Sequence, residues 1–452
     1  MRSFTFKAYE QIPLCITEAL QSRHPNAELH IRNWTRTSQY EGPNTPAEVS
    51  LSRCPNLHSI EVDLGNAESG IDFRRPALKR IVALAPNLTT VNFAHNSIPH
   101  YHPTTNPSFE LYYEQQKLAR SFNVLSPASN SLRNLKSRSG DDLDWLDDVA
   151  ALDKLESLEI GHIPFGDFHL NKNHENRFLS LMCLSVTDKA HTGQGSRRRG
   201  ATLTNFLMNL QPLYSLEISC CAHLLPAYNT FLYHHGTQLR TLIMHEAEMP
   251  TGRGDKAPIG IDQIRRTCPL LTEIGIDIDS STNGVEEFDI FCQLAKFPFL
   301  TTIRIHFGIT RNQFATENPF HRGYLGQTQR TSSWVENIWS VLRDNKAKSE
   351  VAPLQKLVVT MGEVDRKVLQ DPSQTWARWV LENRLQIVAN PSERDDGANE
   401  IVVVTRTKDE RPVRVRRQLL TGTFLVSREM NNQRIFRTSD LNSLFNSENI
   451  LE

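Results

Sequence analysis

A short phrase that recurs along most of the chain constrains its fold more than any other feature. The phrase joins a proline-containing helix-end signal to the pattern Leu-x-x-aliphatic-x-aliphatic, and clear copies lie at residues 54–62, 85–93 and 268–277. Two further copies, at residues 210–218 and 297–305, shift the proline by one place. Because one phrase returns in varied wording, we predict that the protein is a repeat array.

The spacing of the second aliphatic position gives the length of one repeat. Ile60 and Val91 are 31 residues apart, whereas Val91 and Leu158 are 67 apart, so this longer gap is predicted to hold one degenerate unit, which residues 132–135 fit. A Leu-x-x-Leu-x-Leu core with a period of roughly 20 to 29 residues is typical of leucine-rich repeats. The units here are slightly longer, which predicts a full helix in each return segment.

The segments between copies of the phrase carry apolar residues at helical spacing, for example residues 73–83 and 286–296. Because strand and helix alternate in the same direction in every unit, the strands are predicted to form one parallel sheet. The predicted fold class is therefore α/β, a leucine-rich-repeat solenoid (horseshoe) with parallel strands on the concave face and helices on the convex face. We expect this array to span residues 1–390, and residues 391–452 to form a C-terminal cap and a weakly ordered tail.

Composition argues against several classes of partner. Charged residues make up 22% of the chain and apolar residues 39%, which is ordinary for a folded protein. Lys plus Arg (50) and Asp plus Glu (51) nearly cancel, giving a formal net charge of −1. Bulk charge therefore gives no support for nucleic-acid or membrane binding, and we predict neither partner.

Cysteine usage and the N-terminal residues predict a cytoplasmic or nuclear location. The N-terminal residues lack the apolar run of a signal peptide, and no uninterrupted apolar run of about 18 residues occurs. Seven scattered cysteines do not form the pattern of a disulfide framework, which favours reduced thiols inside the cell. Cys54 and Cys268 come just before strands, where we expect them to be small buried hydrophobes without a reactive role.

The N-terminal region and the Cys-Pro-Asn-Leu units resemble the leucine-rich half of fungal F-box proteins. An amphipathic helix, His24-Pro25 and the sequence Leu-His-Ile-Arg-Asn-Trp at residues 29–34 precede the successive units, and the resemblance covers roughly residues 11–390. It implies an array that presents a substrate protein, with the Skp adaptor and a cullin of a ubiquitin ligase as further partners. The F-box itself is not recognisable, since only residues 11–14 echo its opening signature.

Two segments leave an enzyme with a phosphate-handling site open as the alternative. Asp277 and Asp279 follow an apolar strand, as in phosphotransferring hydrolases, although the repeat already explains that strand. The glycine-rich residues 193–200 precede a helix whose N-terminus favours phosphate, but the Lys and Ser or Thr of a P-loop do not follow the last glycine. A solvated basic insert is the simpler interpretation of that segment.

Candidate metal ligands do not match a known spacing. Cys220, Cys221 and His223 precede His234 and His235, but no Cys-x2-Cys pattern is present. No Ser-His-Asp or Cys-His arrangement can be proposed from spacing alone. We therefore predict no catalytic residue, no cofactor and no metal, and a non-enzymatic scaffold that binds another protein.

Strand alternation predicts where a partner binds, because alternate residues of a strand point to opposite faces. With the aliphatic positions inward, the opposite row is acidic over the first two-thirds of the array and ends in the positive residues Arg304 and Lys356. We hypothesise that the acidic stretch meets a basic partner segment, since opposed charges raise association rates and set specificity. An ordinary solvated sheet face is the alternative. The predicted partner-binding residues are Glu61, Asp63, Glu159, Glu217, His245, Glu273, Asp277, Arg304 and His306.

Overall fold

The computed structural model shows a chain of helix and strand units in two compact parts, Met1–Leu213 (unit 1) and Tyr214–Glu452 (unit 2). None of the helices in the described part of the chain is both long and apolar enough to cross a membrane. The residues that the structure describes are 1–7, 11–35, 45–62, 74–93, 131–137, 143, 146, 150–161, 177–187, 196–219, 228–246, 260–279, 285–308, 335, 337–348, 351–361, 385–390, 400–406, 412–418, 423–426 and 435–437.

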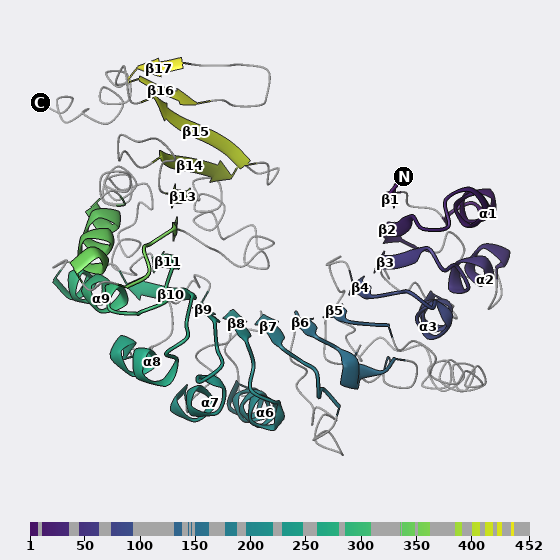
Figure 1. Ribbon diagram of the computed structural model, residues 1–452, viewed down its shortest axis with the longest axis horizontal. Coiled ribbons are helices and arrows are strands. Elements are labelled where there is room, and N and C mark those ends of the chain that lie inside the picture. The colour runs from purple at the N-terminus through teal and green to yellow at the C-terminus, as the bar shows by residue number, and fades with distance from the viewer. Residues whose placement is uncertain are drawn as a thin grey trace, which may run out of the picture. The chain divides into compact units, whose positions relative to one another are not determined.

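In unit 1, each described strand pairs in parallel with the next described strand along the chain. Helices α1, α2 and α3 lie together on one side of these strands (Figure 1). The strands are β1 (Ser3–Lys7), β2 (Glu28–Trp34), β3 (Leu57–Val62), β4 (Thr90–Phe93), β5 (Asn134–Ser137), β6 (Ser157–Ile160) and β7 (Cys183–Thr187). The helices are α1 (Leu14–Arg23), α2 (Pro46–Ser52), α3 (Arg74–Leu84), the short 3-10 helix η2 (Leu152–Lys154) and α6 (Ser196–Asn209).

The asparagine of the repeated phrase explains how successive repeats within unit 1 are joined. The Asn56 side-chain amide is buried and donates to the backbone oxygens of His24, Pro25 and Ala27, at 3.1, 3.0 and 2.7 Å. Asn87, at the same place in the next phrase, donates to the backbone oxygen of Pro55 at 2.8 Å. Each amide thus donates hydrogen bonds to backbone carbonyl groups in the turn of the preceding repeat. Those carbonyl groups would be costly to bury without a donor.

Unit 2 begins with parallel strands and ends with antiparallel ones. Strands β8 (Ser215–Ser219), β9 (Thr241–His245), β10 (Glu273–Asp279), β11 (Thr302–Gly308) and β12 (Lys356–Met361) pair in parallel in chain order. The helices that connect these strands along the chain are α7 (Tyr228–His235), α8 (Ile261–Thr267), α9 (Val285–Ala295) and the helical residues 337–348. The antiparallel strands are β13 (Leu385–Asn390), β14 (Glu400–Arg406), β15 (Pro412–Gln418), β16 (Thr423–Val426) and β17 (Ile435–Arg437).

An aliphatic ladder forms the core of unit 2, as the repeated phrase predicts. Its rungs are in mutual register across β8 to β12, and each is fully buried: Leu216, Leu242, Ile274, Ile303 and Leu357. Ile276, two residues further along β10, is 4% exposed. Cys54 and Cys268 are both buried, as expected for small apolar residues, and burial raises the pKa of the Cys268 thiol. The predicted α/β class with a mostly parallel sheet is confirmed.

The structure differs from the sequence prediction at both ends of the array. Strand β1 pairs with β2 ahead of the first predicted unit, and its alternating sequence Ser-Phe-Thr-Phe-Lys is a strand signal. The parallel arrangement, expected to reach residue 390, ends at β12, because β13 runs antiparallel to it. Strands β14 to β17 lie within residues 391–452, the region predicted to form a cap and tail, and that prediction is left untested by these strands.

Candidate functional site

We call the sheet surface opposite the described helices the front face of each unit. Residues of the aliphatic ladder alternate with half-exposed front-face residues, as in β6, where Ser157 and Glu159 are half-exposed while Leu158 and Ile160 are buried. This alternation places the predicted partner-binding residues of both units on the front face, apart from Asp63, which lies outside the described residues. The ladder is needed for packing, so the front face is where side chains remain available for function.

The front face of unit 1 carries charges of both signs. Lys136 on β5 pairs in register with Glu159 on β6, and its Nζ lies 2.6 Å from Oε1 of Glu159. Both side chains are 36% exposed, so this ion pair contributes little to stability. Glu61 on β3 is half-exposed, and Asn92 separates it from Lys136 along the row. The acidic stretch predicted here is therefore interrupted by Lys136, which belongs to the degenerate repeat.

The acidic residues of unit 2 are also engaged within the chain. Nε of Arg304 on β11 donates to Oε1 of Glu273 on β10 at 2.5 Å, in a diagonal cross-strand contact. Glu217 on β8 is half-exposed on the same face. Asp277, the remaining predicted acidic residue, is buried in a separate cluster with two histidines.

This cluster joins three neighbouring strands. A hydrogen bond of 2.7 Å connects Nδ1 of His245 (β9) and Oδ1 of Asp277 (β10), and the backbone N–H of Glu246 donates to Oδ2 of Asp277 at 2.7 Å. The ring of His306 (β11) stacks on His245, with centroids 3.9 Å apart and planes 27° apart. The side chains of His245 and Asp277 are each 7% exposed. The structure thus brings together three residues that the sequence predicted separately.

Their common place in the repeat is a signal from which the cluster could have been found. His245, Asp277 and His306 each lie three residues after a rung of the aliphatic ladder, at Leu242, Ile274 and Ile303. Equal offsets in parallel, in-register strands place residues side by side, and Asp277 and His306 are indeed direct partners.

The geometry of the cluster suits a structural network better than a reacting group. Both carboxylate oxygens of Asp277 already accept hydrogen bonds, so neither is held ready to attack a substrate. Ser219 pairs in register with His245, but the His245 ring leans across β10 to reach His306, away from the strand that carries Ser219. A Ser-His-Asp relay is therefore not assembled by these three residues.

Other front-face residues of β9 to β12 are also buried. Ile243 is 7% exposed and Val358 is 6% exposed, although both alternate with ladder residues. Gly275 lies between the strands that carry them, and a Cβ there would be 2.8 Å from Cγ2 of Ile243. The glycine is thus required so that the Ile243 side chain can lie over β10.

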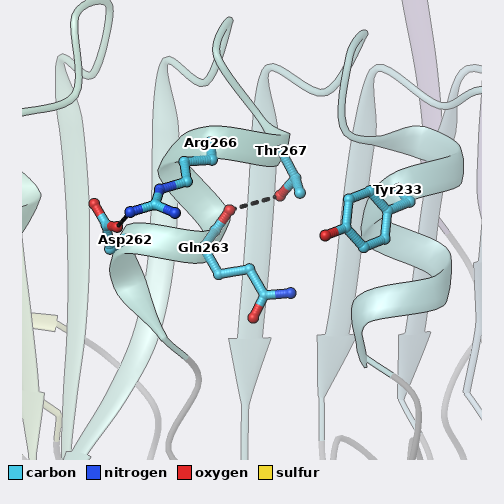
Figure 2. Close-up of a pocket in the computed structure, with 5 residues that line it drawn as sticks. All are labelled: Tyr233, Asp262, Gln263, Arg266 and Thr267. Atoms are coloured by element: carbon cyan, nitrogen blue, oxygen red, sulfur yellow. Dashed lines mark hydrogen bonds and ion pairs between the residues drawn. The ribbon is translucent and has the colours of Figure 1, made fainter.

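A small pocket lies on the helix side of unit 2, between α7 and α8 (Figure 2). Its volume is about 320 Å3, and its lining residues are Tyr233, Asp262, Gln263, Arg266 and Thr267. The hydrogen bond from Arg265 lowers the pKa of the Asp262 carboxyl, and Arg266 lies 2.6 Å from its other oxygen. Thr267 donates to the backbone oxygen of Gln263 at 2.9 Å. These contacts are ordinary within the exposed side of α8, and they point to no ligand chemistry.

The remaining sequence candidates are only partly described. Cys220, Cys221 and His223 lie outside the described residues, whereas His234 and His235 form an edge-to-face pair in α7. Among the side chains that the structure describes, no group of three or more His, Cys, Asp or Glu is placed to hold a metal ion. Residues 193–195 of the glycine-rich segment are not described, and residues 196–200 begin α6.

Comparison with known proteins adds no family. No model of a protein family matches the chain, and no curated protein sequence matches it. The resemblance to F-box proteins therefore rests on the motifs alone. The functional interpretation depends on the side chains and the sheet geometry of this chain.

Proposed function

We propose that the chain is a non-enzymatic protein-interaction module, a leucine-rich-repeat solenoid that binds a protein partner on its front face. The observation that carries this proposal is the separation of two roles along each strand. Rungs such as Ile274 are buried in register, while front-face residues such as Glu61 and Glu159 are charged and half-exposed. Solenoids use such extended faces for binding, because the ladder alone maintains the fold.

An enzyme with a phosphate-handling site near residues 193–200 or Asp277 is the alternative. A nucleophilic aspartate needs an oxygen that is accessible to the substrate. The side chain of Asp277 is 7% exposed, and its oxygens accept hydrogen bonds from His245 and from the Glu246 backbone. This arrangement favours the interaction module over catalysis at Asp277.

The resemblance to F-box proteins supports a narrower form of the proposal. In this form the array is the substrate-binding part of a cullin-type ubiquitin ligase receptor, located in the cytoplasm or nucleus, and its further partners are the Skp adaptor and a cullin. The described N-terminal residues already belong to the repeat architecture, since β1 pairs with β2. Contact with the adaptor would therefore need residues other than these strands.

Affinity capture from the native cells tests the module and the ligase role together. The full chain is compared with a front-face variant carrying Glu61→Lys, Glu159→Lys and Glu217→Lys. A matched control reverses three exposed acids on the helix side, Glu18→Lys, Asp153→Lys and Asp289→Lys. We expect the front-face variant to lose captured proteins that the control retains.

Equal capture by the two variants would show that the front face is not the binding surface. The ligase role predicts that the Skp adaptor and a cullin are captured with the wild type. If other proteins are enriched without them, the ligase role is wrong and the interaction module remains.

A further inference from the structure

The strand-entry edge of unit 2 brings together residues from five successive strands. Each repeat places two residues between its first and second aliphatic positions, such as Arg240 and Thr241 between Leu239 and Leu242. Backbone hydrogen bonds of 2.8 to 2.9 Å link the first residue of each pair to that of the next. The residues linked in this way are Tyr214, Arg240, Thr272, Thr301 and Gln355. The second residues are also in register: Ser215, Thr241, Glu273, Thr302 and Lys356.

Exposed cations dominate this edge. Arg240 and Lys356 are exposed, and neither makes an ion pair with any residue that the structure describes. The side chain of Arg304, two residues after Thr302 on β11, is 42% exposed. It forms an ion pair with Glu273, the one carboxylate among the first and second residues of these pairs. Glu217 on β8 shares the row of Arg304, so the three cations stand against two carboxylates and leave a net charge of +1. Tyr214, Arg240, Arg304, Gln355 and Lys356 are called the basic edge.

Unit 1 has the same row of positions without the excess charge. Its first residues are linked by backbone hydrogen bonds of 2.8 to 2.9 Å in the order His58, Thr89, Arg133, Glu156 and Met182. Nε of Arg133 lies 3.3 Å from Oε1 of Glu156, so the cation and the carboxylate neutralise each other. The positive charge of unit 2 is therefore not required by the repeat, because an equivalent row forms without it.

We propose that the basic edge binds an acidic, extended segment of a partner protein that crosses the strands. This inference rests on the proposed interaction function. Parallel strands lie about 4.8 Å apart, so the three strand spacings between Arg240 and Lys356 amount to roughly 14 Å. An extended chain advances about 3.4 Å per residue, so carboxylates four residues apart reach both cations. Tyr214, with 43% of its surface exposed, extends the edge with an aromatic contact of the kind enriched at protein interfaces.

A protein segment fits this edge better than a nucleic acid. A nucleic-acid backbone carries closely spaced phosphates and is bound by many cations, usually with several stacking aromatic residues. The basic edge offers two cations that are not in ion pairs and a single exposed aromatic ring, in a chain with a net charge of −1. The half-exposed residues Thr241 and Thr302 lie in the same row as Lys356, and their hydroxyl groups suit the amide groups of a peptide.

Binding of the full chain to immobilised peptides tests the proposal. The probe is an eight-residue Gly/Ser peptide with Glu at positions 2 and 6, and its controls carry Glu at positions 2 and 3 or Lys at positions 2 and 6. We expect the spaced Glu peptide to bind best, and its binding to fall as salt rises. The double variant Arg240→Glu, Lys356→Glu should lose at least about tenfold in affinity at low salt.

A double variant with the same charge change in unit 1, Arg23→Glu, Arg53→Glu, serves as the control, because both arginines are exposed. Equal binding by the two double variants overturns the proposal. Tighter binding of an oligouridine RNA, lost in the Arg240 and Lys356 variant, makes the edge a nucleic-acid site and also overturns it. If no peptide binds while the front-face variant still loses its captured proteins, only the basic edge is wrong and the interaction module stands.

Discussion

The same kind of cross-strand contact has different consequences in the two units. The Lys136–Glu159 ion pair of unit 1 is 36% exposed on both sides, whereas the His245–Asp277 pair of unit 2 is 7% exposed. Interactions strengthen as water is excluded, and the loss of one partner then becomes costly. The comparison shows that the repeated phrase specifies the aliphatic side chains that pack between the sheet and the helices. The phrase leaves the residues of the front face free to differ between the two units.

The sequence carries a trace of this difference. Strand β6 of unit 1 alternates as Ser-Leu-Glu-Ile, which is the pattern of a sheet with one solvated face. Strands β9 and β12 instead contain the uninterrupted apolar runs Leu-Ile-Met and Leu-Val-Val. Continuous apolar runs are typical of strands buried on both faces, as Ile243 and Val358 are.

The largest expected effect concerns Asp277. In Asp277→Ala, the Nδ1 of His245 and the backbone N–H of Glu246 lose a buried acceptor, and each loss costs about 1–3 kcal/mol. We expect the free energy of unfolding to fall by about 2–6 kcal/mol, measured by urea denaturation. Asp277→Asn keeps the shape and one carbonyl acceptor, so it should lose less. A change below about 1 kcal/mol for Asp277→Ala would remove the distinction between the two units.

A second effect of similar size depends on pH and on Lys346. This side chain is 1% exposed, and its Nζ donates to the backbone oxygens of Phe297 and Ala352 at 3.1 and 3.2 Å. Burial lowers the pKa of Lys346 to about 8, from an ordinary value of 10.5. The unfolded chain therefore binds more protons between pH 8 and 10.5, and the contribution of Lys346 to stability rises with pH in that window.

The rise expected from this group is about 3 kcal/mol across the window, since one pKa unit corresponds to about 1.4 kcal/mol. Lys346→Met removes the titration, so the stability difference between wild type and variant should change by this amount from pH 8 to 10.5. Parallel pH profiles for wild type and Lys346→Met would show that Lys346 is not desolvated.

The smallest expected effect concerns the exposed pair of unit 1. Glu159→Ala should lower the free energy of unfolding by less than about 1 kcal/mol, because exposed ion pairs are screened by water and salt. Added salt should reduce the difference from wild type further. A loss comparable to that of Asp277→Ala would mean that the front face of unit 1 is as strongly coupled as that of unit 2.

The sequence by itself determined the parts of the fold that depend on burial. Rungs such as Ile60 and Ile274, and the cysteines Cys54 and Cys268, lie inside because a repeated apolar position has one favourable environment in a stack of similar units. The face on which each predicted site residue lies followed from strand alternation, since successive side chains point in opposite directions. The equal offsets of His245, Asp277 and His306 were also present in the sequence.

Only the tertiary structure decided the direction of the C-terminal strands, the interaction partners of the front-face residues and the orientation of their side chains. A period of two is unchanged when a strand is reversed, so the apolar pattern of residues 385–390 could not show that β13 runs antiparallel. Whether Glu159 meets Lys136, and whether His245 reaches across β10 to His306, depends on which strands become neighbours and on how much water their side chains retain. Local sequence specifies a residue's face, whereas the residues brought beside it decide its charge environment, because electrostatic energies depend on distance and solvent rather than on chain order.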